Sequence, residues 1–178
     1  MAHSTPPLDY DAADTLVVSE PAQLRALGDE LRARIVGLLR ERAASASELG
    51  GLLGLPKGTV GHHLKVLEKA GLVHVVRTRR VRAVTEKFYG RVARLFLIQS
   101  EDELVHGVAA ASFRAVAVDL GASPEIAMHG HVRVRLSPAD AKRFNRRLDK
   151  LLQDARAAEA PEGETWGFAT ALYKLAPR

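Results

Sequence analysis

The hydrophobic positions from residue 21 to residue 43 recur every three or four residues, which is the period of amphipathic helices. Gly28-Asp29 interrupts the repeat, and Pro21 suits the first position of a helix. The pattern therefore predicts two helices, at 21–27 and 29–43.

The next segment has the pattern of two helices joined by a tight turn. Ser45 and Glu48 have the spacing of a capping box, so a short helix is expected over about 46–53. Gly54-Leu55-Pro56 breaks the pattern, and the helical period resumes over 57–70 before a glycine that suits a left-handed cap. This arrangement is a helix-turn-helix.

After residue 71 the period changes to that of β-strands. Residues 72–76 are rich in valine, and residues 81–85 have a composition that can return as the partner strand. Arg77-Thr78-Arg79-Arg80 lies between them and reads as a polar turn. The sequence predicts a β-hairpin with an arginine-rich tip.

Two further helices are predicted after the hairpin. Residues 88–98 are apolar enough to form a packed helix. Ser100 and Glu103 again have the spacing of a capping box, and the helix that they begin is expected to end at Gly121. The alanine-rich face of this second helix would allow close packing against another helix.

The last third of the chain has a different character. Residues 131–136 alternate between polar and apolar side chains, as a strand does, and Trp166 to Leu175 also reads as a strand. Between them Ser137-Pro138 opens a helix that carries Phe144, Leu148 and Leu151 on one side. A small β-α-β subdomain is therefore expected, with residues 160–164 as a surface loop.

The predicted fold class is α+β: a winged helix-turn-helix domain with long dimerisation helices and a small C-terminal β-α-β extension. Residues near the start contain Pro6-Pro7 and show no sustained period, so they are expected to form an arm that is disordered or docks late and has no function of its own. The predicted divisions are an acidic arm at 1–20, the winged helix-turn-helix domain at 21–98, a dimerisation or linker helix at 99–121 and the C-terminal subdomain at 122–178.

Charge is unevenly distributed along these divisions. The chain of 178 residues has a formal net charge of +5, from 26 Lys and Arg and 21 Asp and Glu. Residues 1–20 carry −4, residues 21–95 carry +9 from 15 basic and 6 acidic side chains, and residues 96–178 are neutral. A segment this basic favours a polyanionic partner, with nucleic acid ahead of an anionic membrane surface, while a solvated Arg-rich surface is the alternative.

Composition excludes several classes of site. The chain has no cysteine, so thiol catalysis, thiolate metal sites and disulfides are excluded. No apolar run was expected to reach the roughly 20 residues of a membrane span, and the first residues lack the pattern of a secretory signal. The expected location is the cytoplasm, with no membrane partner and no cofactor.

Two stretches of the chain carry a resemblance to a known family. Leu27 to Ile35 looks like the opening, and Thr59 to Val73 resembles the recognition helix and the entry to the wing, of the ArsR-like winged-helix transcriptional regulators. The resemblance covers about residues 21–98. It implies a winged-helix fold that binds double-stranded DNA.

The helical period separates buried from exposed positions on the recognition helix. Val60, Leu64 and Leu67 are spaced to be buried, which leaves the polar positions facing outward. Thr59 and His62 are candidates for base edges, whereas the cationic side chains suit phosphates. The predicted DNA-binding residues are Lys57, Thr59, Gly61, His62, His63, Lys65, Arg77, Arg79, Arg80 and Arg82.

One of these predictions depends on comparison with the family, and another concerns the wing. Gly61 stands where the family commonly has serine, so one polar contact is expected to be missing. The wing arginines are expected to reach phosphates or a narrow minor groove.

A single winged helix reads only a few base pairs, so a homodimer on a pseudo-palindromic operator is expected, with residues 21–43 and 88–120 as the interface. The resemblance implies repression, because the wider family usually represses by occupying a promoter. The sequence does not exclude activation.

Other roles compete with this reading. The aromatic residues Phe144, Trp166, Phe168 and Tyr173 are expected in the core, with a pocket for a small organic effector as the alternative. A protein-interaction module with weak nonspecific DNA binding is the second alternative. A metalloenzyme based on His129 and His131 is the third, and it is disfavoured because two imidazoles without a carboxylate make a weak site. No nucleotide loop or nucleophile elbow is present, so no enzyme activity is expected.

Overall fold

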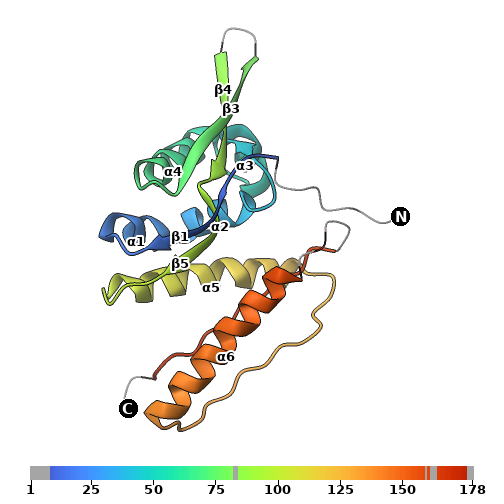
Figure 1. Ribbon diagram of the computed structural model, residues 1–178. Helices are drawn as coiled ribbons and strands as arrows, with labels where there is room; N and C mark the ends of the chain where they lie inside the picture. Colours follow the sequence, from blue (N-terminus) through green and yellow to red (C-terminus); the bar gives the residue numbers. More distant parts are fainter. Residues whose placement is uncertain (1–8, 82–83, 159, 161–163, 176–178) are drawn as a thin grey trace. The chain divides into compact units, whose positions relative to one another are not determined.

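The computed structural model describes residues 9–81, 84–158, 160 and 164–175 (Figure 1). The chain divides into two compact units, with the boundary between Val118 and Asp119. The first unit contains the helix-turn-helix and the wing. The second contains one long helix with an extended segment on each side of it in sequence.

Four short helices in the first unit match the predicted order. They are α1 (Pro21–Leu27), α2 (Glu30–Leu38), α3 (Ala46–Leu53) and α4 (Lys57–Lys69). Helix α2 ends at Leu38, five residues earlier than predicted, because the chain turns there to place Ala44 and Ser45 in a strand. The pairing of that strand overrides the local helical pattern.

The capping box at the start of α3 is confirmed. The Glu48 backbone N–H donates to Ser45 Oγ at 3.3 Å, and the Ser45 N–H donates to Glu48 Oε2 at 2.9 Å. Gly71 follows α4 with a φ of 68°, the left-handed conformation predicted for it. These local features fix the ends of α3 and α4 and hence the angle at which the two helices meet.

The strands of the first unit form two small sheets. In the three-stranded sheet, β2 (Ala44–Ser45), β4 (Val84–Arg91) and β3 (Val73–Val81) are antiparallel in the order β2-β4-β3. In the other sheet, β1 (Ala13–Val18) is parallel to β5 (Ala93–Ile98). The wing is therefore the β3-β4 hairpin, which projects from the rest of the first unit in Figure 1.

Two predictions about these strands are wrong, and the N-terminal arm takes the docked form of its two predicted alternatives. Residues 88–98 are not a helix but the end of β4 and all of β5. A short apolar run does not distinguish a helix from a buried strand, and here Phe88 and Tyr89 are buried within a ladder. Arg77 to Arg80 are not a turn, because β3 continues to Val81. The arm is not without structure, since β1 forms a ladder with β5.

The core of the first unit joins all four short helices. Leu24, Ile35, Leu49, Leu64 and Leu67 are each fully buried within one cluster. Burial of a large aliphatic side chain contributes roughly 1.5–3 kcal/mol, so these contacts hold the helix-turn-helix in place. On α4 the buried residues lie along one side of the helix, and the opposite side is exposed.

Helix α5 (Leu104–Ala122) packs against this core through Val108 and Ala111. Its Arg114 Nε lies 3.2 Å from Glu30 Oε2 of α2. By length and composition alone α5 could also cross a membrane, so the expectation that no stretch qualifies does not hold for it. One such helix is a weak indication, because the core helices of soluble proteins meet the same criterion.

In the second unit only the predicted helix is formed. Helix α6 (Pro138–Ala157) begins where Ser137 Oγ accepts the Asp140 N–H at 3.1 Å. Residues 131–136 and 166–175 are extended but belong to no ladder in the described part of the chain. The predicted C-terminal β-α-β extension therefore has its helix without its two strands, because a strand requires a hydrogen-bonded partner.

Candidate nucleic-acid interface

One side of α4 presents a row of exposed polar side chains. Val60, Leu64 and Leu67 are fully buried on the opposite side, so the row cannot rotate into the core. The exposed members of the row are Lys57, Thr59, His62 and Lys65. The structure thus brings together the residues predicted to face outward, on a helix of the kind that enters the major groove.

Gly61 lies in the middle of this row and is half-buried. A Cβ added to Gly61 would meet no atom within 4 Å, so the space beside the backbone is open. Because no side chain stands there, a DNA strand could approach the α4 backbone more closely at this point than at its neighbours.

His63 does not share the exposure of this row. Its side chain is 17% exposed, and its Nδ1 lies 3.8 Å from Asp29 Oδ1 at the start of α2. Desolvation lowers the pKa of His63, with Asp29 opposing the shift and Arg32 and His62 adding to it. The position places the imidazole against α2, with its ring centre 5.5 Å from that of the exposed His62.

The wing supplies a second group of cations. Arg77, Arg79 and Arg80 are exposed on β3, while Arg82 lies outside the described residues. The guanidinium carbons of Arg77 and Arg79 lie 4.8 and 5.1 Å from the centre of the Phe88 ring. Stacking on one buried ring holds both arginines along the same side of the hairpin.

Two of the three described wing arginines already have acidic partners. Arg79 Nη2 lies 2.9 Å from Glu86 Oε2 on β4, and this hydrogen bond lowers the pKa of Glu86. Arg77 Nη1 lies 2.6 Å from Asp9 Oδ2. Among the described residues Arg80 has no ion pair, so it is the wing arginine whose charge is uncompensated.

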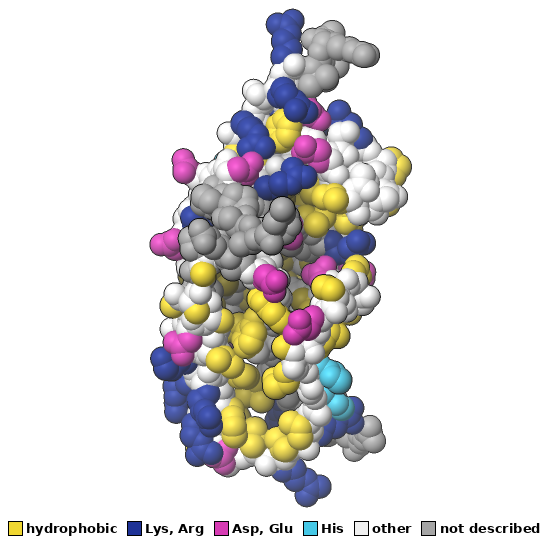
Figure 2. Space-filling view, turned by 90° about the vertical axis from the view of Figure 1, so that its right-hand side faces the viewer, with side chains coloured by type: hydrophobic (Ala, Val, Ile, Leu, Met, Phe, Trp, Pro, Cys, Tyr) yellow, Lys and Arg dark blue, Asp and Glu magenta, His cyan; other side chains and the backbone are white. Residues whose placement is uncertain are grey.

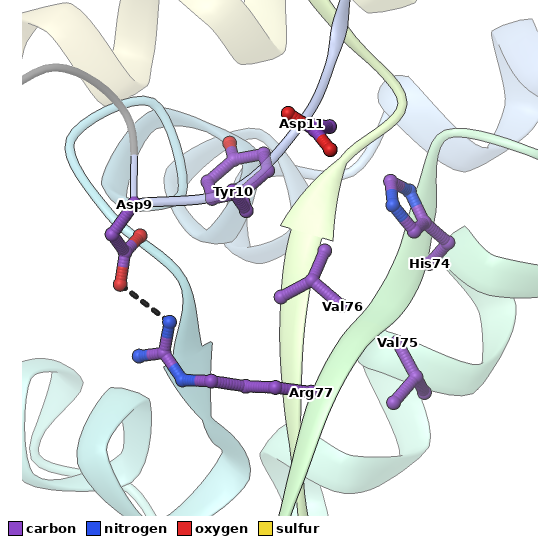
Figure 3. Close-up of a pocket in the computed structure, with 7 residues that line it drawn as sticks. All are labelled: Asp9, Tyr10, Asp11, His74, Val75, Val76 and Arg77. Atoms are coloured by element: carbon purple, nitrogen blue, oxygen red, sulfur yellow. Dashed lines mark hydrogen bonds and ion pairs between the residues drawn. The ribbon is translucent and has the colours of Figure 1, made fainter.

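The partner of Arg77 comes from the N-terminal arm. Figure 3 shows the Asp9 carboxylate pointing toward the Arg77 guanidinium, with which it forms the ion pair. The pair lies beside an open pocket of about 500 Å³, which is also lined by Tyr10, Asp11 and His74. The Ala43 N–H donates to Asp9 Oδ1 at 2.7 Å. Burial raises the pKa of Asp9, but the Ala43 N–H and the Arg77 guanidinium outweigh it and hold that pKa below its usual value.

Tyr10 anchors the arm beside this ion pair. Its hydroxyl donates to the Leu39 carbonyl and accepts the Arg91 N–H at 3.2 Å. The Tyr10 ring lies flat on Gly90, where an added Cβ would be 2.6 Å from the ring. Sequence reasoning gave the arm no function. The signal that could have indicated docking was its charge of −4 beside a segment of +9.

Arg91 is a buried cation next to the arm. It is 4% exposed, and its guanidinium carbon lies 4.2 Å from the centre of the Phe96 ring. Burial, together with Arg40, lowers the pKa of Arg91 to about 10, so the group stays charged at neutral pH. Its Nε has no hydrogen-bond partner among the described residues, and its role here is packing on Phe96.

The geometry gives less support to two other sites considered from the sequence, a metal site and an aromatic pocket for an effector. The described residues contain no group of three or more His, Asp or Glu side chains that could hold a metal ion. Trp166 and Tyr173 are 56% and 69% exposed, so they line neither a core nor an enclosed pocket in the described chain. The expectation that they are core residues is therefore wrong.

Comparisons with known proteins address the first unit. Residues 27–76 match the family model described as a helix-turn-helix domain. HlyU from Vibrio cholerae is 23% identical over 54% of this chain and 87% of its own, with a TM-score of 0.35. The transcriptional repressor BigR from Xylella fastidiosa is 26% identical over 55% of this chain and 83% of its own, with a TM-score of 0.34. No curated protein matches the chain.

The family match covers the two helices of the motif and the entry to the wing. Together with the exposed polar row on α4, this match defines the class of the protein, which is a DNA-binding transcriptional regulator. Within that class, residues 27–76 match a helix-turn-helix domain, which agrees with the resemblance to the ArsR-like winged-helix regulators seen at Thr59 to Val73.

Proposed function

We propose that the protein is a sequence-specific repressor that binds a pseudo-palindromic operator as a homodimer in the cytoplasm. The observation that carries the proposal is the exposed polar row on α4, held outward by three fully buried aliphatic residues. DNA-binding regulators of this class are generally not enzymes, and the proposal includes no catalytic activity.

The two groups of side chains have different roles in the proposal. Thr59 and His62 contact base edges, because they carry directional hydrogen-bonding groups in the first half of α4. Lys57 and Lys65 contact phosphates beside them, and Arg79 and Arg80 contact the flanking backbone from the wing. His63 acts indirectly by holding α4 against Asp29.

Two features support the homodimer: the few base pairs that one helix-turn-helix contacts, and the exposed apolar surface of α5. A single recognition helix spans only a few base pairs, and a two-fold dimer doubles the contact. Helix α5 exposes Phe113 at 42% although the helix is mostly apolar. This exposed side of α5, together with the neighbouring α1 and α2, is the surface that the second copy buries.

Selection from a pool of random duplex DNA at near-physiological salt tests the proposal. Salt suppresses purely electrostatic binding, so enrichment of an inverted repeat with half-sites about one helical turn apart supports a dimeric sequence reader. The matched control is Ser47→Ala, an exposed change on α3, beside His62→Ala on α4. If His62→Ala abolishes the enrichment and Ser47→Ala does not, the result supports the assignment of His62 as a base contact. No enrichment with the wild type, and binding that vanishes as salt rises, refutes it.

A further inference from the structure

The second unit exposes its apolar side chains. No described side chain from Asp119 to Leu175 is buried, although the unit contains aromatic and large aliphatic residues on all three of its segments. A folded unit needs apolar surface removed from water to offset the entropy of ordering the chain. One copy of this unit does not supply that burial within itself.

Helix α6 shows the pattern of a helix that packs on one side. Phe144, Leu148 and Leu151 lie along a hollow of about 390 Å³, which is also lined by the charged side chains Arg147, Lys150 and Asp154. Figure 2 shows apolar side chains gathered in the lower part of the view beside Lys and Arg. Within the described part of the second unit, Phe144 and Leu151 on this side of α6 therefore remain exposed.

The segments on either side of α6 alternate like strands in sequence but pair with no strand among the described residues. No backbone hydrogen bond joins residues 126–136 or 166–175 to any other described residue. Val132, Val134 and Leu136 alternate with polar residues, as strand residues with one buried side do. Unpaired edges of this kind are templates for pairing with another chain.

The exposed area has the size of a protein interface. Thirteen large apolar residues of the second unit are more than a third exposed, from Ile126 to Leu175. At about 200 Å² of surface for each such residue when fully exposed, they present on the order of 1,500 Å². Burial of about half of this area equals the roughly 800 Å² that each partner contributes to a standard interface.

The alternation selects between possible strand pairs. A register that sets the apolar residues of 131–136 opposite apolar residues of the same segment in a second copy also sets arginine opposite arginine, which is destabilising. Pairing with residues 166–172 sets two of the three apolar residues opposite large apolar side chains and the third opposite Thr170, and it sets the two arginines opposite two of Gly167, Ala169 and Ala171. The second combination has no clash of like charges.

We infer that the second units of two copies of this chain associate, with residues 131–136 of one copy paired to residues 166–172 of the other and the apolar sides of α6 covered between them. Two strands and one helix are too few for a stable unit, whereas two copies provide four strands and two helices. The inference goes beyond the proposed function and does not depend on DNA binding.

The absence of cysteine from the chain allows a direct test in the full-length protein. One copy carries Val134→Cys and a differently tagged copy carries Phe168→Cys, and the mixture is treated with a short bifunctional maleimide. A covalent heterodimer is expected. The matched control pairs Val134→Cys with Leu52→Cys, an equally exposed apolar position on α3, for which no heterodimer is expected.

Two further variants distinguish this interface from the one proposed at α5. Leu151→Asp on the apolar side of α6 is expected to reduce the heterodimer yield at least ten-fold, while Arg146→Asp on its basic side is not. Circular dichroism of both variants verifies that the helices remain. An equal effect of the two variants overturns the inference.

The remaining outcomes also decide the question. Equal yields from the test and control pairs overturn the inference. So does a crosslink that forms only within one copy carrying both cysteines, because the two strands then pair inside a single chain. Selection of an operator by the same preparation would leave the proposed function standing in either case.

Discussion

Replacing Asp9 with Asn removes the negative charge that neutralises Arg77 at the base of the wing. The asparagine keeps an oxygen that can accept the Ala43 N–H, which Asp9 Oδ1 accepts at 2.7 Å, so the arm can stay docked. In the wild type the Arg77 guanidinium must leave Asp9 before it can contact a phosphate. The D9N change is therefore expected to increase affinity for DNA.

The magnitude follows from the exposure of the ion pair. The Arg77 and Asp9 side chains are 43% and 38% exposed, so solvent screens their attraction despite a separation of 2.6 Å. Exposed pairs contribute about 0.2–1 kcal/mol, which corresponds to a gain of about 1.4-fold to 5-fold in affinity. One added phosphate contact steepens the dependence of log K on log salt by about 0.9.

The assay is a titration of operator DNA by fluorescence anisotropy at several salt concentrations. Asp11→Asn is the matched control, because it removes the same charge from the same arm but Asp11 has no ion pair with a described residue. The D9N change is also measured in a protein that carries Arg77→Ala and so lacks the Arg77 guanidinium. Equal gains for D9N and Asp11→Asn, or a gain for D9N that persists without Arg77, would refute the reasoning.

Three further predictions concern stability and the arm. Ser45→Ala removes the buried cap of α3 and is expected to lower the free energy of unfolding by about 1 kcal/mol in a denaturant titration, whereas the exposed Ser47→Ala on the same helix is not. Gly90→Ala places a Cβ 2.6 Å from the Tyr10 ring and should speed amide exchange in β1, an effect that Gly51→Ala, with open space around it, should lack. His63 has a lowered pKa, so the folded state disfavours its protonation and stability should fall as pH drops from the unfolded value of 6.5 through the lower folded value. His63→Gln should flatten that part of the pH profile, and an unchanged profile would remove His63 as the cause.

The local parts of the fold and of the candidate site could be predicted from the sequence. The capping box at Ser45 and Glu48, the left-handed Gly71 and the buried positions on α4 depend on contacts between residues within a few positions of each other. The period of the hydrophobic residues then decides which side chains of α4 face outward. The exposed members of the polar row on α4 were predicted correctly as outward-facing for that reason: Lys57, Thr59, His62 and Lys65.

Tertiary pairing decided the rest. Asp9 meets Arg77 across 68 positions of sequence, and Tyr10 meets Arg91 across 81, so no local pattern records either contact. The apolar residues of β5 form a strand because β1 provides a partner, whereas residues 131–136 alternate more regularly and form no ladder among the described residues. The capped start of α3, the glycine after α4 and the buried face of α4 are set by neighbours in sequence, and the sequence by itself determined them, whereas the end of α2 was set by strand pairing. Strands exist only where a second strand satisfies their hydrogen bonds, and that was decided by the tertiary structure.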